Sequence, residues 1–137
     1  MVGDGAFLMH ASVLATAYEY QIPVVYVIWN NYAYGSIRGL QRGYLGGREL
    51  ATDFKHPGTT TPYNPDFAAM AHSAGVDGVS VDRAADLNEA IRKGIASGKP
   101  CVIDANINGD LNPAGAGIWE LPGMGRSKPG IGQQYIP

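Results

Sequence analysis

The sequence alternates between segments with the apolar spacing of a helix and short segments that are apolar almost throughout. Residues 22–29, IPVVYVIW, form a β-branched and aromatic run typical of strands that are buried on both faces, which favours a parallel sheet. The segment before it, residues 7–20, has helical spacing. The expected apolar face of this helix consists of Phe7, Met9 or His10, Val13, Leu14 and Ala17.

The same alternation returns in the second half of the chain. Asn64, Pro65 and Asp66 predict the start of a helix, with a capping residue, a proline at the first helical position and an acid in the first turn. This helix should run to about Ser73 and end at Gly75.

Two strands and one further helix are expected after Gly75. Residues 78–81 predict a short strand, and residues 100–107, PCVIDANI, predict a second buried strand. Between them, Asp82 is expected to cap a helix. The apolar stripe of that helix consists of Leu87, Ala90, Ile91, Gly94 and Ile95.

This order of elements predicts an α/β fold, a doubly wound and mostly parallel sheet with helices on both faces. We assign residues 1–108 to this module and residues 109–137 to a tail rich in Gly and Pro. Residues 35–43 predict one or two helical turns. Residues 43–63 predict a long polar loop, and loops of that length are usually functional or disordered.

Composition narrows the functional classes. Charged residues make up 16% of the 137 residues, against about 25% in an average soluble domain, so we expect a partner to cover part of the surface. The net charge is −2 without a run of Lys or Arg, which argues against nucleic acid as a partner. No apolar run approaches the roughly 18 residues that span a membrane. The single cysteine, Cys101, fits a buried small hydrophobe in a reducing, cytoplasmic setting.

A short acidic turn and an asparagine pair carry the candidate chemistry. Gly3-Asp4-Gly5 precedes the first expected helix, and Asn30-Asn31 follows the first buried strand. A helix of about 14 residues runs about 21 Å, and a strand of about seven residues returns about 23 Å. The two motifs should therefore lie at the same edge of the sheet, where open α/β sheets bind ligands.

Both motifs supply groups that suit a metal and a phosphate. Asp4 offers a carboxylate and Asn31 an amide oxygen, which are donors that Mg²⁺ prefers. The backbone N–H groups of Gly5 and Ala6 can receive a phosphate, and Gly3 allows the backbone to approach a ligand closely. The pattern predicts a metal-bridged diphosphate. A flavodoxin-like nucleotide binder with a chance Gly-Asp-Gly turn is an alternative.

These motifs resemble those of the thiamine-diphosphate-dependent enzymes. The matching segments are GDGAFLMHASVLATA, VVYVIWNNYAYG and the later L…AI…G…GKPCVID, which lie within residues 1–108. The chain is similar to the group formed by acetohydroxyacid synthases, pyruvate oxidases and benzoylformate decarboxylases. The resemblance implies thiamine diphosphate and Mg²⁺ as cofactors, with Asp4, the Asn31 side chain and the backbone carbonyl of Ala33 as metal ligands. The implied cofactor-binding residues are Gly3, Asp4, Gly5, Ala6, Asn31, Tyr34 and Gly35.

The resemblance also implies a reaction and partners. Such enzymes decarboxylate 2-keto acids, join them to an acceptor, or do both. Their diphosphate module begins with a strand of which only Met1 and Val2 remain here, so we expect a first strand that is largely missing and a chain that is part of a larger enzyme. A pyrimidine-binding domain would come from the missing part or from another subunit of a homo-oligomer. The isolated chain is expected to be inactive, and a non-catalytic product or interaction module without cofactor is the alternative.

Single side chains around the motifs have simpler expected roles. Asn30 is expected to fix the loop by hydrogen bonding. Arg38 is placed on a solvated helix face, with contact to a substrate carboxylate as the alternative. Tyr32 and Tyr34 either flank the cofactor or pack. The related synthases carry Trp at the position that aligns with Leu40, which implies a wider acceptor pocket in this chain. No catalytic acid or base is identified.

Overall fold

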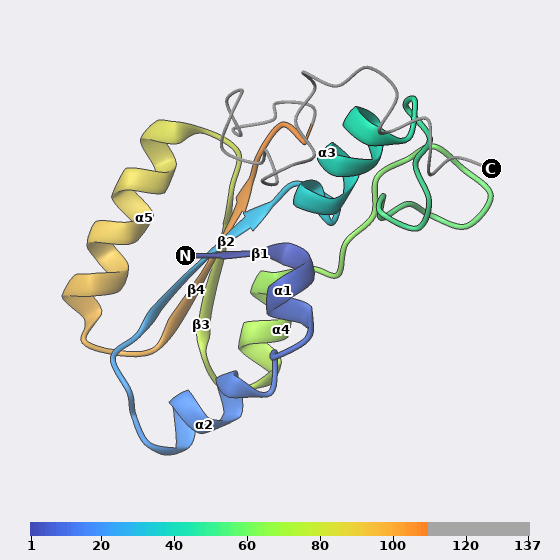
Figure 1. The fold of residues 1–137 in the computed structure, drawn as a ribbon. Coiled ribbons are helices and arrows are strands. Elements are labelled where there is room, and N and C mark those ends of the chain that lie inside the picture. Colours follow the sequence, from blue (N-terminus) through green and yellow to red (C-terminus); the bar gives the residue numbers. More distant parts are fainter. Residues whose placement is uncertain (110–137) are drawn as a thin grey trace, which may run out of the picture.

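A parallel four-stranded sheet forms the centre of the computed structural model, which describes residues 1–109 (Figure 1). The strands lie in the order β1-β2-β4-β3, so that the last strand along the chain is inserted between the second and the third. Their bounds are Val2–Gly3 for β1, Val25–Asn30 for β2, Asp77–Val81 for β3 and Cys101–Asn106 for β4. The expected parallel sheet is confirmed, and β1 is a strand of two residues.

Helices cover both faces of this sheet, as the sequence predicts. Figure 1 shows α5 on one side, and α1 and α4 on the other. The helices are α1 (Asp4–Leu8), α2 (Val13–Glu19), α3 (Gly35–Tyr44), α4 (Phe67–Ser73) and α5 (Ala84–Ser97).

Each face has its own apolar core because side chains alternate along a strand. On the face of α1 and α4, Ile28 and Val102 of the sheet pack against Phe7 and Phe67. The rings of Phe7 and Phe67 meet edge to face, with centroids 5.7 Å apart. On the other face, Val27 and Ile103 belong to a second core, and the half-buried side chains of α5 pack against it.

The single helix predicted over residues 7–20 is wrong, because the structure has two helices there. Between α1 and α2, His10 N–H donates to the Phe7 carbonyl and Val13 N–H to the His10 carbonyl, which are bonds across three residues that interrupt the helix. Met9 is 66% exposed and His10 is exposed as well, so neither position contributes to an apolar face. Leu14 and Ala17 are buried as predicted.

Two predicted helix starts are displaced. Pro65 lies before the cap of α4, because the Asp66 carboxylate caps the helix by accepting from the Ala69 N–H at 2.8 Å. Asp82 does not cap α5, which follows Arg83, because its carboxylate accepts from the Asn106 amide at 2.8 Å instead.

The remaining expectations for α3, α5 and the long loop have mixed outcomes. The stripe predicted for α5 is wrong at Ile95, which is 68% exposed, while Leu87, Ala90 and Ile91 pack against the core as expected. The helix α3 is longer than predicted and reaches Tyr44. The polar segment after it has no helix or strand up to α4, as expected, apart from isolated bridges that include Ala33 with Asp53.

Candidate functional site

The Gly-Asp-Gly turn and the asparagine pair meet at the carboxyl edge of the sheet, as their spacing predicts. The strands β1 and β2 are parallel neighbours, with Gly3 opposite Trp29, so Asp4 and Asn30 follow at adjacent strand ends. Asp4 and Asn30 are each 2% exposed. The edge therefore presents buried polar groups at the position where open α/β sheets bind ligands.

Asp4 is a buried carboxylate held by uncharged donors. One of its oxygens accepts from the Gly5 N–H at 2.8 Å, and the other accepts from the Asn64 side-chain amide at 2.8 Å. Within residues 1–109, no Lys, Arg or His forms an ion pair with it. A buried carboxylate is costly unless a cation or hydrogen bonds compensate it. The position therefore favours a bound cation.

The backbone between Asn31 and Ala33 takes an uncommon conformation. Tyr32 has φ of +57°, a left-handed value that bulky residues rarely adopt and that often occurs at functional sites. The Tyr32 hydroxyl donates to the Asn106 amide oxygen at 2.8 Å, which anchors the turn to β4. The Asn31 amide oxygen accepts from the Ala33 N–H at 3.2 Å.

The carbonyl of Ala33 is left out of the local strand pairing. The bridge between Ala33 and Asp53 is flanked by two hydrogen bonds, from the Tyr34 N–H to Thr52 and from the Phe54 N–H to Tyr32. Both bonds use neighbouring residues, so the pairing does not occupy the Ala33 carbonyl.

Two glycines of the predicted site are required by close approaches. A Cβ atom on Gly5 would lie 2.4 Å from the Tyr34 ring, and one on Gly35 would lie 2.5 Å from the Asn31 amide nitrogen. The Tyr34 ring packs edge to face on Phe54, with centroids 4.8 Å apart. The structure thus brings Gly5, Asn31, Tyr34 and Gly35 together. A Cβ on Gly3 would meet nothing within 4 Å, and Ala6 next to Gly5 is exposed.

A chain of hydrogen bonds extends from Asp4 into the sheet. Asn64 bridges Asp4 to Asn30, and the Asn30 amide donates to the Asp104 carboxylate at 3.0 Å. Ser80 donates to the second Asp104 oxygen at 3.5 Å. The prediction that Asn30 acts as a hydrogen-bonding residue is confirmed.

The sequence reasoning missed Asp104 and Asn64. Asp104 is 4% exposed, and its burial raises the pKa of the carboxyl group. The sequence does contain a sign of Asp104, because an acidic residue within a predicted buried strand indicates a polar contact in the core. Asn64 carried no such signal, because its place before Pro65 predicts a helix cap and gives no sign of a contact with Asp4.

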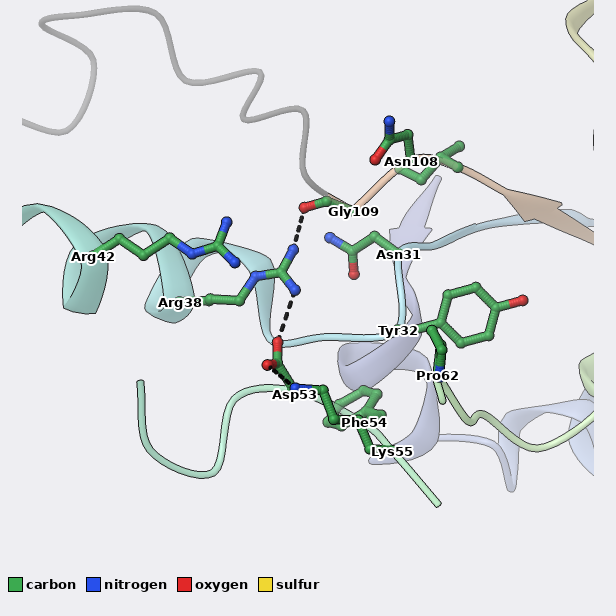
Figure 2. A pocket seen from close by; sticks show the side chains of 11 residues that line it. Asn31, Tyr32, Arg38, Arg42, Asp53, Phe54, Lys55, Pro62, Asn108 and Gly109 are labelled. Carbon is green, nitrogen blue, oxygen red and sulfur yellow. Dashed lines mark hydrogen bonds and ion pairs between the residues drawn. The ribbon is translucent and has the colours of Figure 1, made fainter. Parts of the chain in front are cut away.

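The prediction for Arg38 is wrong, because its side chain is buried instead of solvated. The side chain is 10% exposed, and its guanidinium donates to the Asp53 carboxylate at 2.7 Å and to the Gly109 carbonyl (Figure 2). Lys55 contacts the second Asp53 oxygen at 2.8 Å. The hydrogen bond with Lys55 and that with Arg38 lower the pKa of Asp53 to about 2.

A cavity of about 410 Å³ lies beside this ion pair and reaches Asn31. Figure 2 shows the Arg38 guanidinium between Asp53 and Gly109 in its wall. Gly109 packs directly on the turn, since a Cβ atom there would lie 2.5 Å from the Asn31 carbonyl oxygen. The long loop, α3 and the end of β4 are thereby fixed around the asparagine pair.

Residues 1–109 contain no cluster of three or more His, Cys, Asp or Glu side chains that could hold a metal. A magnesium site at Asp4 would therefore combine one carboxylate with amide, carbonyl and phosphate oxygens, which is a set that Mg²⁺ commonly uses. In the same part of the chain, no helix is both long and apolar enough to cross a membrane.

Comparison with known proteins assigns this edge to a family. Residues 1–105 match the model of the thiamine pyrophosphate enzyme C-terminal TPP-binding domain. The chain belongs to the thiamine pyrophosphate enzyme family. The matched region includes the Gly-Asp-Gly turn, the asparagine pair and nearly all of the sheet.

Relatives of this thiamine pyrophosphate enzyme domain include enzymes with different reactions. The acetolactate synthase large subunit of Parasynechococcus marenigrum is 33% identical over 107 residues, which cover 78% of this chain and 16% of that protein. A sulfoacetaldehyde acetyltransferase of Castellaniella defragrans is 31% identical over 93 residues, which cover 68% of this chain and 14% of that protein.

A solved structure supports the same fold. The thiamine diphosphate-dependent 4-hydroxybenzoylformate decarboxylase of Rhodococcus jostii RHA1 superimposes with a TM-score of 0.68 at 30% identity. The match covers 78% of this chain and 19% of the decarboxylase. The chain thus spans about a fifth or less of the length of these relatives, and the domain division at residue 108 stays a prediction.

Proposed function

We propose that the chain forms the metal- and diphosphate-binding part of an enzyme that uses thiamine diphosphate and Mg²⁺ to act on 2-keto acids by decarboxylation, carboligation or both. Asp4 carries this proposal. Its carboxylate is buried at the carboxyl edge of the sheet, has only neutral hydrogen-bond donors within residues 1–109, and lies where the family match covers the chain. A cation bound there would compensate the buried charge.

The residues present fit the metal and the diphosphate. Asp4 and the Asn31 side chain would bind Mg²⁺, and the Ala33 carbonyl, which the bridge to Asp53 leaves out of its hydrogen bonds, would complete the protein ligands. Each oxygen of these two side chains accepts one hydrogen bond, two at Asp4 and one at Asn31, so lone pairs remain for a cation. These three protein ligands carry one negative charge in total. They leave coordination positions and positive charge on Mg²⁺ for diphosphate oxygens.

The turn around these ligands would receive the diphosphate. The backbone N–H groups of Gly5 and Ala6 lie in the first turn of α1, where the Gly5 N–H also donates to Asp4, and Gly3 has open space beside its Cα. Tyr34 and Gly35 would form the opposite wall, because Tyr34 lies against Gly5 and Gly35 against the Asn31 amide. These contacts fix the shape of the site before a ligand arrives.

When bound, thiamine diphosphate would supply the nucleophilic carbon that attacks the 2-keto acid carbonyl, and this chain would hold and orient it. We assign no catalytic acid or base to these residues. Because the matched segment makes up about a fifth or less of each of these relatives, we propose that a pyrimidine-binding domain comes from further polypeptide or from another subunit of a homo-oligomer.

The experiment is carbon dioxide release from a panel of 2-keto acids by the purified enzyme, with thiamine diphosphate and Mg²⁺. We expect turnover of at least one aliphatic or aromatic 2-keto acid that requires both additions. Absence of turnover across the panel, in an enzyme that binds the cofactor with its pyrimidine-binding domain present, would contradict the proposed substrate class.

A further inference from the structure

Asn64 is placed next to the Gly-Asp-Gly turn by a part of the chain that lies 60 residues away. It comes directly before Pro65, which biases its backbone toward an extended conformation. The cap of α4 follows at Asp66, and Phe67 is fully buried against Phe7 of α1. The helix α4 therefore fixes the position of Asn64 relative to the helix that starts at Asp4.

The side-chain amide of Asn64 uses both of its hydrogens at this edge. Nδ2 donates to the Asp4 carboxylate at 2.8 Å and to the Asn30 amide oxygen at 2.6 Å. Asn30 in turn donates to the Asp104 carboxylate. Because a carboxylate only accepts, the Asn30 amide can point in one direction only, and this fixes which atoms of Asn64 face Asp4.

We propose that Asn64 is a positioning residue that orients the Asp4 carboxylate for the metal by joining it to Asn30. Without this bond, Asp4 would keep the hydrogen bond from the neighbouring Gly5 N–H. That single bond would constrain the plane of the carboxylate less than the two bonds do together. An amide is suited to the task because it orients the carboxylate without neutralising it. A Lys or Arg in its place would compete with the cation for the same charge.

This inference rests on the proposed function, since it concerns the metal that Asp4 would hold. Groups that orient a metal ligand typically change metal affinity about 10- to 100-fold when they are removed. The structural alternative is that Asn64 only stabilises the start of α4. Asp66 provides the matched control, because it caps α4 two residues later and its carboxylate contacts Ala69 instead of the Asp4 network.

The test is a calorimetric Mg²⁺ titration of the purified full enzyme, with its pyrimidine-binding domain present, at fixed thiamine diphosphate, together with thermal melts without cofactor. We expect Asn64→Ala to raise the half-saturating Mg²⁺ concentration about tenfold or more. We expect Asp66→Ala to lower the melting temperature but to change the half-saturating Mg²⁺ concentration by no more than about twofold. If Asn64→Ala does not fold, Asn64→Gln, which displaces the amide by one methylene, should raise the half-saturating concentration with less effect on the melt.

The outcomes separate this inference from the function on which it rests. An unchanged Mg²⁺ requirement in a folded Asn64 variant, with normal Mg²⁺-dependent binding by the wild type, would overturn the role of Asn64 alone. Equal increases in Asn64→Ala and Asp66→Ala would also overturn it, because they would show an effect of helix stability. Failure of the wild type to bind thiamine diphosphate with Mg²⁺ would overturn both proposals.

Discussion

Replacing Arg38 by Gln should destabilise the fold, although Arg38 lies outside both apolar cores. The guanidinium donates to the Asp53 carboxylate at 2.7 Å and to the Gly109 carbonyl, and its side chain is 10% exposed. It thus joins α3 to the long loop and to the segment after β4. Gln is shorter and uncharged, so both bonds are lost.

The size of the loss in the free energy of unfolding depends on the contacts that Asp53 retains in the variant. A hydrogen bond to a charged group contributes about 1.5–3 kcal/mol, and breaking a fully buried ion pair costs about 3–5 kcal/mol. The upper range does not apply, because Asp53 is 20% exposed and retains Lys55 at 2.8 Å. The variant also regains part of the side-chain entropy of a long residue. We expect a loss of about 2 kcal/mol in the free energy of unfolding.

Urea unfolding, followed by tryptophan fluorescence, measures this loss, and Arg83→Gln is the matched control. Arg83 undergoes the same chemical change, but its side chain is 78% exposed and its pair with Asp86 is 3.9 Å long, so the expected loss is about 0.5 kcal/mol or less. A double-mutant cycle with Asp53→Asn should show coupling of about 1 kcal/mol. Equal losses for Arg38→Gln and Arg83→Gln, or no coupling to Asp53, would refute the reasoning.

Three further predictions concern pH, packing and selectivity. Burial raises the pKa of Asp104, so its proton favours the folded state at low pH, and this contribution is lost as pH rises through the raised pKa. The melting temperature of Asp104→Asn should therefore increase relative to that of the wild type as pH rises above about 4, the ordinary pKa of an Asp carboxyl. A difference that stays constant with pH would contradict this. Gly78→Ala should cost about 1–3 kcal/mol, because its Cβ would lie 2.5 Å from the Ala68 carbonyl oxygen, whereas Gly43→Ala, with nothing within 4 Å, should not destabilise in the same urea assay. Under the proposed function, Leu40→Trp should lower kcat/KM for bulky 2-keto acids by roughly 10- to 200-fold while sparing pyruvate, and equal losses across a substrate panel would show that residue 40 only packs.

The fold and the two motifs could be predicted because they depend on local periodicity and on strand direction. The run at residues 22–29 is apolar on both faces, so a parallel central strand follows from the sequence. The meeting of Asp4 with Asn30 follows from the lengths of the intervening elements. Neither inference requires knowledge of a contact between distant side chains.

The errors arose where distant side chains decide the local structure. Arg38 has the spacing of a solvated helix residue, and its burial depends on Asp53 and Gly109, which the loop and β4 bring to it. Asp82 has the position of a helix cap, but its carboxylate accepts a hydrogen bond from the Asn106 amide instead. Asn64 acquires its contacts with Asp4 and Asn30 only when α4 packs on α1.

Calorimetric titration of thiamine diphosphate into the purified full enzyme, with its pyrimidine-binding domain present and with either Mg²⁺ or excess chelator, tests the central claim most directly. We expect binding with Mg²⁺ and loss of binding with chelator. Asp4→Ala should abolish the Mg²⁺-dependent binding, because it removes a ligand together with the charge that compensates the cation, and Asn31→Ala should weaken it less, because the amide is neutral. Equal affinity with and without Mg²⁺, or wild-type affinity in Asp4→Ala at the same Mg²⁺ concentration, would contradict the account.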